Sequence, residues 1–381
     1  MNNSNFSLLK SVKSFLEKRF QPTREDRKTS IKVCHWIRKM DFPHKGQRKR
    51  GETKEEVKKT VMGAVVEQTS IEQSAEQFST KDGDTIRYHL NKLDINGISE
   101  VFISSFQQCG ELLKRKKKIK SPLILAVDTM DIRYYGKRRD EYIHQYKNEW
   151  FYRYITVSTV KSPYGALPLG AFPVSTFDSK EGLLESLFNK FSLKNRNIKV
   201  LYADRGFYSV EVVKLLQAYT IPFVIGARKN KKIRSYLENF PKTGKITSVP
   251  YTMKSVQGET TEVMLHAYWL PKRKDWFVCI SWHISSEQQI YDYCHRWGIE
   301  TSYRLLKSIS VSTTTNNATV RFLYLCFSLL VLALYVCFRS SVIPPFFTPP
   351  SNKPLLKRSR PVTLYFTLRC LRSSLYGGEI V

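Results

Sequence analysis

The chain has 381 residues, of which 42% are hydrophobic and 13% aromatic; this is enough for two or three domains with a substantial core and argues against a disordered chain. Its 62 lysines and arginines outnumber 33 acidic residues, and the net charge of +29 indicates a polyanionic partner, most simply nucleic acid. A basic protein without such a partner, or one associated with ribosomes, is the alternative.

Residues 1–120 are expected to form a helical, basic DNA-binding region. Apolar residues at helical spacing predict a helix over 55–68. Two short helices follow at 70–78 and 84–93, around a turn that contains Gly83. This arrangement suggests a helix-turn-helix.

The second helix of that pair would present Arg87, Asn91 and Lys92 outward, where they would contact DNA. Many helical hairpins of this kind bind nothing, so the strongly basic composition is what favours DNA binding here. A basic stretch at 112–120 is expected to link this region to the next domain.

Residues 121–226 predict the first part of an α/β catalytic domain. Two buried strands each end in an acid, because the run 123–127 precedes Asp128 and the run 198–203 precedes Asp204. The other predicted elements are strands at 151–160, 166–175 and 221–225 and helices at 180–193 and 209–219. This order predicts a mixed sheet with helices packed on it.

Residues 227–283 interrupt this scheme and predict a β-rich insertion. Its strands are expected at 248–256, 261–269 and 276–282. Residues 284–340 would complete the catalytic domain with a helix at 285–307 and another around the apolar run 322–338. That run is just long enough for a membrane span, but a helix buried on all sides explains it equally well. Residues 341–381 form a Pro-rich, basic tail.

The helix predicted at 285–307, with a cap and an acidic first turn near Ser285, carries mixed charges on one face. At about 100° per residue, four side chains fall within an arc of roughly 60°: Tyr293, Arg296, Glu300 and Lys307. Ile299 and Leu306 point the other way, toward a core. A solvated face with i,i+4 charge pairs is the structural alternative.

Three carboxylates are candidates for catalysis and metal binding: Asp128, Asp204 and Glu300. If the strands that end in the two aspartates are neighbours, these carboxylates lie within about 5 Å of each other and repel unless a cation lies between them. Such oxygen ligands suit Mg²⁺ or Mn²⁺. Glu300 from a crossing helix would complete a site for two ions about 4 Å apart.

The remaining residues on the Glu300 face would then serve the DNA. Arg296 and Lys307 would hold backbone phosphates, and Tyr293 would donate a hydrogen bond to one of them. Either aspartate has a structural alternative as a helix cap or turn residue, and Asp131 and Asp178 are weaker competitors for the metal role.

The spacing Tyr-x2-Arg-x3-Glu-x6-Lys, met by Tyr293, Arg296, Glu300 and Lys307, resembles the signature of DDE transposases of the insertion-sequence IS-four group. More narrowly, the chain is similar to the archaeal branch first described from halophiles. The other matching stretches are 127–129, 134–136, 201–209, 296–304 and 313–315. The likeness covers about residues 70–340.

This resemblance implies an RNase H-like catalytic domain with a β insertion, in which Asp128, Asp204 and Glu300 bind two Mg²⁺ or Mn²⁺ ions. It implies cleavage at element ends, strand transfer into target DNA and a homodimer on the terminal inverted repeats. It also implies an aromatic residue in the insertion that stacks on a flipped base, for which Trp269 and Trp276 are candidates besides a role in sheet packing.

The rival hypotheses are an RNase H-like nuclease or resolvase without strand transfer, a defective copy that only binds DNA, and a membrane protein. The presence of all three acids argues against a defective site.

Seven scattered cysteines without a Cys-x-x-Cys pair are typical of a reducing compartment. We therefore expect a cytoplasmic protein with no membrane partner, and the resemblance implies that it is nucleoid-associated and prokaryotic.

Overall fold

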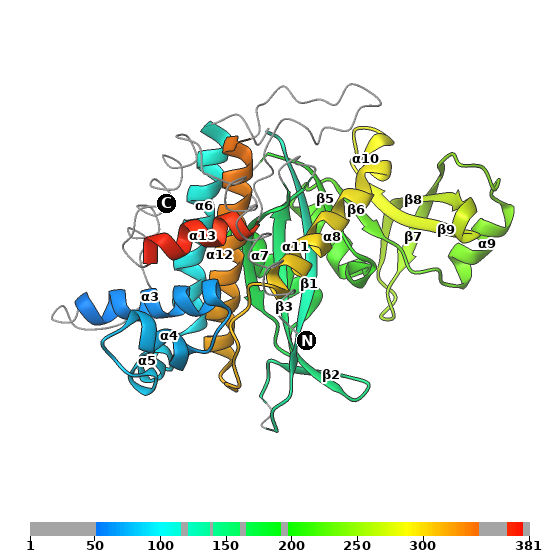
Figure 1. Ribbon diagram of the computed structural model, residues 1–381. Helices are drawn as coiled ribbons and strands as arrows, with labels where there is room; N and C mark the ends of the chain where they lie inside the picture. The colour runs from blue at the N-terminus through cyan, green and yellow to red at the C-terminus, as the bar shows by residue number, and fades with distance from the viewer. Residues whose placement is uncertain are drawn as a thin grey trace, which may run out of the picture.

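The structure is a computed structural model that describes residues 51–115, 121–137, 140–160, 165–191, 197–342 and 364–375. A helical layer lies at one end, a mixed sheet in the middle and a β-rich extension at the other end (Figure 1). The first fifty residues of the expected DNA-binding region, most of the basic linker and most of the Pro-rich tail lie outside the described residues.

Four helices form the N-terminal part of the helical layer: α3 (Gly51–Glu67), α4 (Ile71–Phe78), α5 (Gly83–Leu90) and α6 (Ile95–Arg115). Helix α4 begins with a capping box in which the Ser70 side chain accepts from the Gln73 backbone and the Gln73 side chain accepts in return. Helix α5 begins at the cap Asp82, whose carboxylate accepts from Thr85 N. The two predicted short helices are thus present, with the turn between them.

The central sheet contains β1 (Leu123–Tyr134), β2 (Ile143–Tyr146), β3 (Glu149–Thr159), β4 (Leu167–Pro173), β5 (Ile198–Ala203) and β6 (Phe223–Gly226). Its order is β2-β3-β1-β5-β6, and β4 pairs with β3 outside this order. Strand β3 is antiparallel to both β1 and β4, whereas β5 is parallel to both β1 and β6. The expected mixed α/β sheet is confirmed.

Strand β1 is longer than the sequence pattern predicts. It continues past Asp128 to Tyr134 because β3 pairs with it along its whole length, up to the partners Tyr134 and Trp150. The parallel partner β5 stops earlier, at the pair Val127 and Ala203. Asp128 therefore lies where β5 leaves the side of β1, and not at the end of β1 itself.

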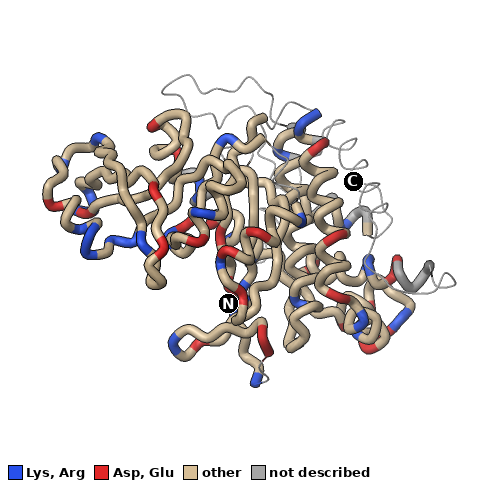
Figure 2. The backbone as a smooth tube through the Cα atoms, turned by 180° about the vertical axis from the view of Figure 1, so that it is seen from behind, with Lys and Arg blue, Asp and Glu red and all other residues tan. Residues whose placement is uncertain are grey.

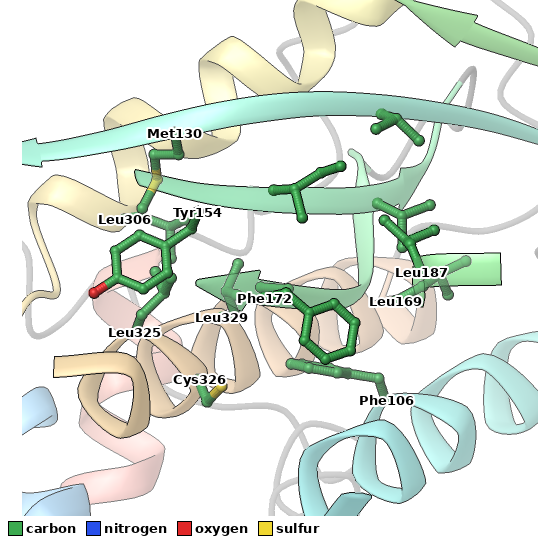
Figure 3. Close-up of a cluster of buried hydrophobic side chains, with 14 of the residues drawn as sticks. Phe106, Met130, Tyr154, Leu169, Phe172, Leu187, Leu306, Leu325, Cys326 and Leu329 are labelled. Atoms are coloured by element: carbon green, nitrogen blue, oxygen red, sulfur yellow. The ribbon is translucent and has the colours of Figure 1, made fainter. Parts of the chain in front are cut away.

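Helices pack on the sheet. Helix α12 (Ala318–Val342) packs against β4 and α6, and its side chains Leu325 and Leu329 face Tyr154 and Phe172 of the sheet in Figure 3. Its stretch Ala318–Cys337, with a mean hydropathy of 2.2, is by length and composition apolar enough to cross a membrane, but 89% of the tested window is buried inside the protein. That burial matches a core helix.

Smaller helices complete the layers: α7 (Lys180–Lys190), α8 (Val210–Ala218) and α13 (Leu364–Leu375). The first two begin at the caps Ser179 and Ser209, whose hydroxyls accept from backbone N–H groups. Helix α13, which the sequence pattern did not predict, packs on α12 and α3 and pairs Arg372 with Glu67 at 2.8 Å.

The predicted insertion forms α9 (Lys231–Asn239), β7 (Thr247–Lys254), β8 (Thr260–Leu270) and β9 (Asp275–Trp282). Its three strands agree with the expected ones, and α9 was not expected. Strand β9 pairs with β6, so the insertion extends the central sheet to nine strands and is not a separate unit. Trp269 and Trp276 face each other across β8 and β9, with ring centroids 5.4 Å apart.

The prediction of a single helix at 285–307 is wrong. The segment contains α10 (Gln288–Tyr291), a 3-10 stretch η4 (Asp292–Arg296) and α11 (Trp297–Lys307). Two long-range bonds hold the break, because Gln289 donates to Lys199 O and Tyr293 donates to Ala203 O. A 3-10 stretch turns more per residue than an α-helix, so the predicted common face does not run the length of the segment.

Candidate active site

The first two predicted acids meet at the edge between parallel strands. Val127 and Ala203 are register partners, so Asp128 and Asp204 follow them side by side. Asp128 is buried, with 6% of its surface exposed, and its Oδ1 accepts from Thr129 N at 2.8 Å. Asp204 also caps the short helix η2 (Arg205–Phe207), since its Oδ1 accepts from Gly206 N at 2.8 Å. The proposed turn role of Asp204 is therefore real and leaves its second oxygen for other contacts.

Arg296 joins Asp128 to the third predicted acid. One guanidinium nitrogen donates to Asp128 Oδ2 at 2.6 Å and the other to Glu300 Oε1 at 3.0 Å. Arg296 is 9% exposed, whereas the Glu300 side chain is half exposed. Within the part of the chain that the structure describes, Arg296 Nε is buried and has no hydrogen-bond partner.

The electrostatics of Asp128 reflect this crowding. Burial raises the pKa of Asp128 to about 6, because it disfavours the charged form; the Arg296 guanidinium acts in the opposite direction, and the negative charges of Asp204 and Glu300 add to the rise. The pKa of Arg296 is raised although burial alone would lower it, because Tyr293, Asp128 and Glu300 surround the guanidinium. The cluster therefore needs a cation between its carboxylates.

Tyr293 connects the cluster to the backbone of β5. Its hydroxyl donates to Ala203 O at 2.9 Å, and its ring lies 5.7 Å from the Arg296 guanidinium carbon. Burial raises the pKa of the Tyr293 phenol. Gly226 permits this approach, since a Cβ there would lie 2.8 Å from the Tyr293 hydroxyl. In this structure the hydroxyl thus serves the backbone of β5, and its predicted bond to a phosphate stays a prediction.

Sequence reasoning missed a second tyrosine at this site. The Tyr303 hydroxyl lies 2.5 Å from Thr156 Oγ1, and Thr156 is the register partner of Asp128 on β3. The Thr156 hydroxyl also reaches the Asp128 carbonyl at 3.5 Å. The available signal was the position of Tyr303 three residues after Glu300, which places both on neighbouring positions of α11.

Basic side chains missed by the sequence reasoning surround Asp204. The negative charge of Asp204 acts to raise the pKa of both Arg153 and Lys180, and the Lys180 ammonium donates to Gly206 O. The pKa of Lys180 is lowered, first by burial and then by the neighbouring Arg228. Figure 2 shows Lys and Arg on the β insertion and on the N-terminal helices as well, with Asp and Glu among them.

Other predicted residues lie away from the carboxylates. Lys307 is exposed two turns further along α11, and Arg87, Asn91 and Lys92 are exposed on or just after α5. The competitors for the metal role are engaged elsewhere, because Asp131 forms two bonds to Arg153 at 2.8 and 2.9 Å and Asp178 accepts from Ser175 N.

The donor set fits a divalent cation. Asp128, Asp204 and Glu300 offer carboxylate oxygens, the ligands that Mg²⁺ and Mn²⁺ prefer; the two aspartates follow register partners on neighbouring strands, and Glu300 is joined to Asp128 through Arg296. Among the described residues, no three acids, histidines or cysteines are already arranged as a metal site. The Arg296 guanidinium instead supplies the positive charge between Asp128 and Glu300.

Comparisons with known proteins identify the fold and the family of the chain. The cryo-EM structure titled "piggyBac transposase synaptic complex with hairpin DNA" is similar over 91% of this chain and 76% of that chain, with a TM-score of 0.52 and 14% identity. At that identity the likeness shows the fold, a transposase RNase H-like sheet preceded by helices. No curated protein matches the chain significantly. The family model described as "Transposase DDE domain" matches residues 119–332, more than half of the sequence, so the chain belongs to the DDE transposase family of DNA-cleaving enzymes.

Proposed function

We propose that the protein is the transposase of an insertion sequence, of the IS-four group and its archaeal branch, which cuts the element ends and joins them to target DNA. The observation that carries this proposal is the convergence of Asp128, Asp204 and Glu300 around Arg296. The spacing from Tyr293 to Lys307 supports the narrower grouping.

The mechanism assigns a role to each residue of the cluster. Asp128, Asp204 and Glu300 would hold two Mg²⁺ or Mn²⁺ ions. When bound, such ions lower the pKa of a water or 3′-hydroxyl nucleophile and stabilise the leaving oxygen. The β1–β5 register holds the two aspartates side by side, and Tyr303 and Thr156 brace the strand that carries Asp128. Once metal ions neutralise Asp128 and Glu300, Arg296 would be released to hold a DNA phosphate.

The partner in this proposal is DNA, comprising the terminal inverted repeats and the target. The net charge of +29 supports it, and the similar piggyBac structure is itself a synaptic complex with DNA. We propose a homodimer on two DNA ends, in the nucleoid of a prokaryotic cytoplasm. Residues 1–120 would bind the repeats, 121–226 and 284–340 would catalyse, 227–283 would contact the DNA end, and 341–381 have no proposed role.

The test uses purified protein and DNA that carries the terminal repeats flanking its own gene. Wild type should cleave the ends and join them to target DNA when Mg²⁺ or Mn²⁺ is present. Glu300→Gln should lose both reactions, by about 10³-fold or more, while it keeps its affinity for the DNA ends. Glu287→Gln, at an acid of the same segment outside the cluster, is the matched control and should cleave normally.

Each other result has a definite meaning. Cleavage without joining would favour a nuclease or resolvase. Binding without metal-dependent cleavage would overturn the catalytic proposal and leave only DNA binding. Normal cleavage by Glu300→Gln would show that Glu300 is not a metal ligand.

A further inference from the structure

A groove of about 880 Å³ opens beside the carboxylate cluster. It lies between the outer half of β1, the neighbouring part of β3, the C-terminal end of α11 and the first turns of α12. Lys307, at one side of the groove, is seven residues from Glu300 on the same segment of chain, which corresponds to about 10 Å along an α-helix. The groove therefore lies close to the proposed catalytic carboxylates.

The buried end of the groove is apolar. Met130 of β1, Tyr154 of β3, Leu306 of α11 and Leu325 of α12 line it and are at most 6% exposed. Figure 3 shows these four side chains gathered from the four elements. A volume of this size, with an apolar end, is in the range of pockets that hold small organic groups, about 300–1,000 Å³.

One polar group at that end has no partner. The Tyr154 hydroxyl is buried, and within the described part of the chain it forms no hydrogen bond. Unpaired buried hydroxyls are uncommon in folded proteins and call for a specific explanation. Because this oxygen is inaccessible from the groove, it does not by itself identify a ligand there.

The open side of the groove carries aromatic and basic side chains. Tyr135 and Tyr146 are 86% and 67% exposed, which is unusual for large aromatic residues. Two arginines of the lining are neutralised, Arg133 by Glu149 and Arg153 by Asp131.

Two further cations are not neutralised in this way. Among the described residues, neither Lys307 nor Arg321 forms an ion pair with a carboxylate, so the groove has an excess of positive charge. Arg321 is held in place because its Nε donates to Thr315 O at 2.6 Å and its guanidinium lies 5.2 and 5.0 Å from the rings of Tyr134 and Tyr152.

Exposed aromatic rings beside uncompensated cations are the chemistry that binds unpaired nucleotides, because bases stack on the rings while phosphates meet the cations. We propose that this groove binds an unstacked, single-stranded stretch of the DNA strand next to the scissile phosphate, with bases on Tyr135 and Tyr146 and phosphates on Lys307 and Arg321. The proposal rests on the proposed function for the identity of the strand. It places a single-strand site on the β1–β3 ribbon, far along the sheet from the insertion.

The test measures binding of a short fluorescein-labelled oligothymidylate to the full chain in EDTA, by fluorescence anisotropy, so that no cleavage is needed. Tyr135→Ala and Tyr146→Ala should each weaken binding by at least about fivefold. Phe177→Ala is the matched control, because Phe177 is 85% exposed but does not line the groove. All three positions are exposed, and thermal melting should confirm that the variants fold.

A second measurement does not depend on variants. Photocrosslinking of wild type to an oligonucleotide that contains 5-iodouracil should give crosslinked peptides that include Tyr135 or Tyr146. Equal affinities of Tyr135→Ala, Tyr146→Ala and Phe177→Ala would overturn the proposal, as would crosslinks only elsewhere. An equal loss for duplex of the same sequence would overturn the single-strand assignment. If the groove result holds while the cleavage assay fails, only the proposed function falls.

Discussion

The protein uses the same ionic arrangement twice, in two very different surroundings. In the helical layer, Arg87 pairs with Glu72 at 3.0 Å and Asp84 at 2.9 Å, and all three side chains are at least 44% exposed. In the sheet, Arg296 pairs with Asp128 at 2.6 Å and Glu300 at 3.0 Å, and the Arg296 and Asp128 side chains are at most 10% exposed.

The difference teaches that burial, and not the number of ion pairs, decides what such an arrangement does. Exposed pairs contribute about 0–1 kcal/mol because water and salt screen them. A buried charge cannot lose its partner without a cost of several kcal/mol. The Arg87 group is therefore free to release its arginine to another anion, whereas the Arg296 group stays together until another cation replaces the guanidinium.

The largest expected effect breaks the buried arrangement. Arg296→Gln leaves Asp128 buried beside Asp204 and Glu300 without a cation, and should destabilise the metal-free protein by about 3–5 kcal/mol in urea unfolding with EDTA. Added Mg²⁺ should stabilise this variant more than wild type, because no guanidinium competes for the carboxylates. A variant as stable as wild type, or one that Mg²⁺ stabilises less, would contradict this account of Arg296.

The next effect is a pH dependence at Asp128. Its pKa is raised to about 6, so the folded state binds a proton more tightly than the unfolded chain. The stability that this provides is full below about pH 4 and is lost as the pH rises through about 6. Asp128→Asn does not titrate, so from pH 4 to pH 7 its metal-free stability should gain about 2 kcal/mol relative to wild type. A pH-independent difference would contradict the raised pKa.

The smallest expected effect concerns the exposed arrangement. Arg87→Gln should change the free energy of unfolding by less than about 1 kcal/mol. If α5 contacts DNA as predicted, the same variant should weaken duplex binding and reduce the slope of log affinity against log salt by about one. Unchanged affinity and slope would show that Arg87 serves only Glu72 and Asp84, and the comparison with Arg296→Gln would then concern stability alone.

Local sequence patterns were sufficient to predict the elements whose bounds depend on their own residues. The apolar run before Asp204 matches β5 at both ends. The helices expected from residues 70 and 209 begin at Ser70 and Ser209, whose side chains accept from the backbone N–H three residues later. The side-by-side placement of Asp128 and Asp204 followed from two strand ends and one assumption, that the strands are neighbours.

The features that were missed depend on contacts between distant residues. Asp128 does not end its strand because β3 continues beside β1, and the helix before Glu300 breaks because Gln289 and Tyr293 bind the backbone of β5. No local periodicity contains that information. Helix α9 was missed because it buries only Ile233 and Leu237, too few apolar positions to reveal a period.

The apolar helix α12 has a consequence for the newly made chain. The machinery that inserts proteins into membranes recognises stretches of about this length and hydropathy. The two main partners of α12, α6 and β4, precede it in the sequence and leave the ribosome first, so most of its packing surface is ready when it emerges. The order of elements along the chain thus protects the helix, and a fragment that begins after α6 would expose it to missorting and aggregation.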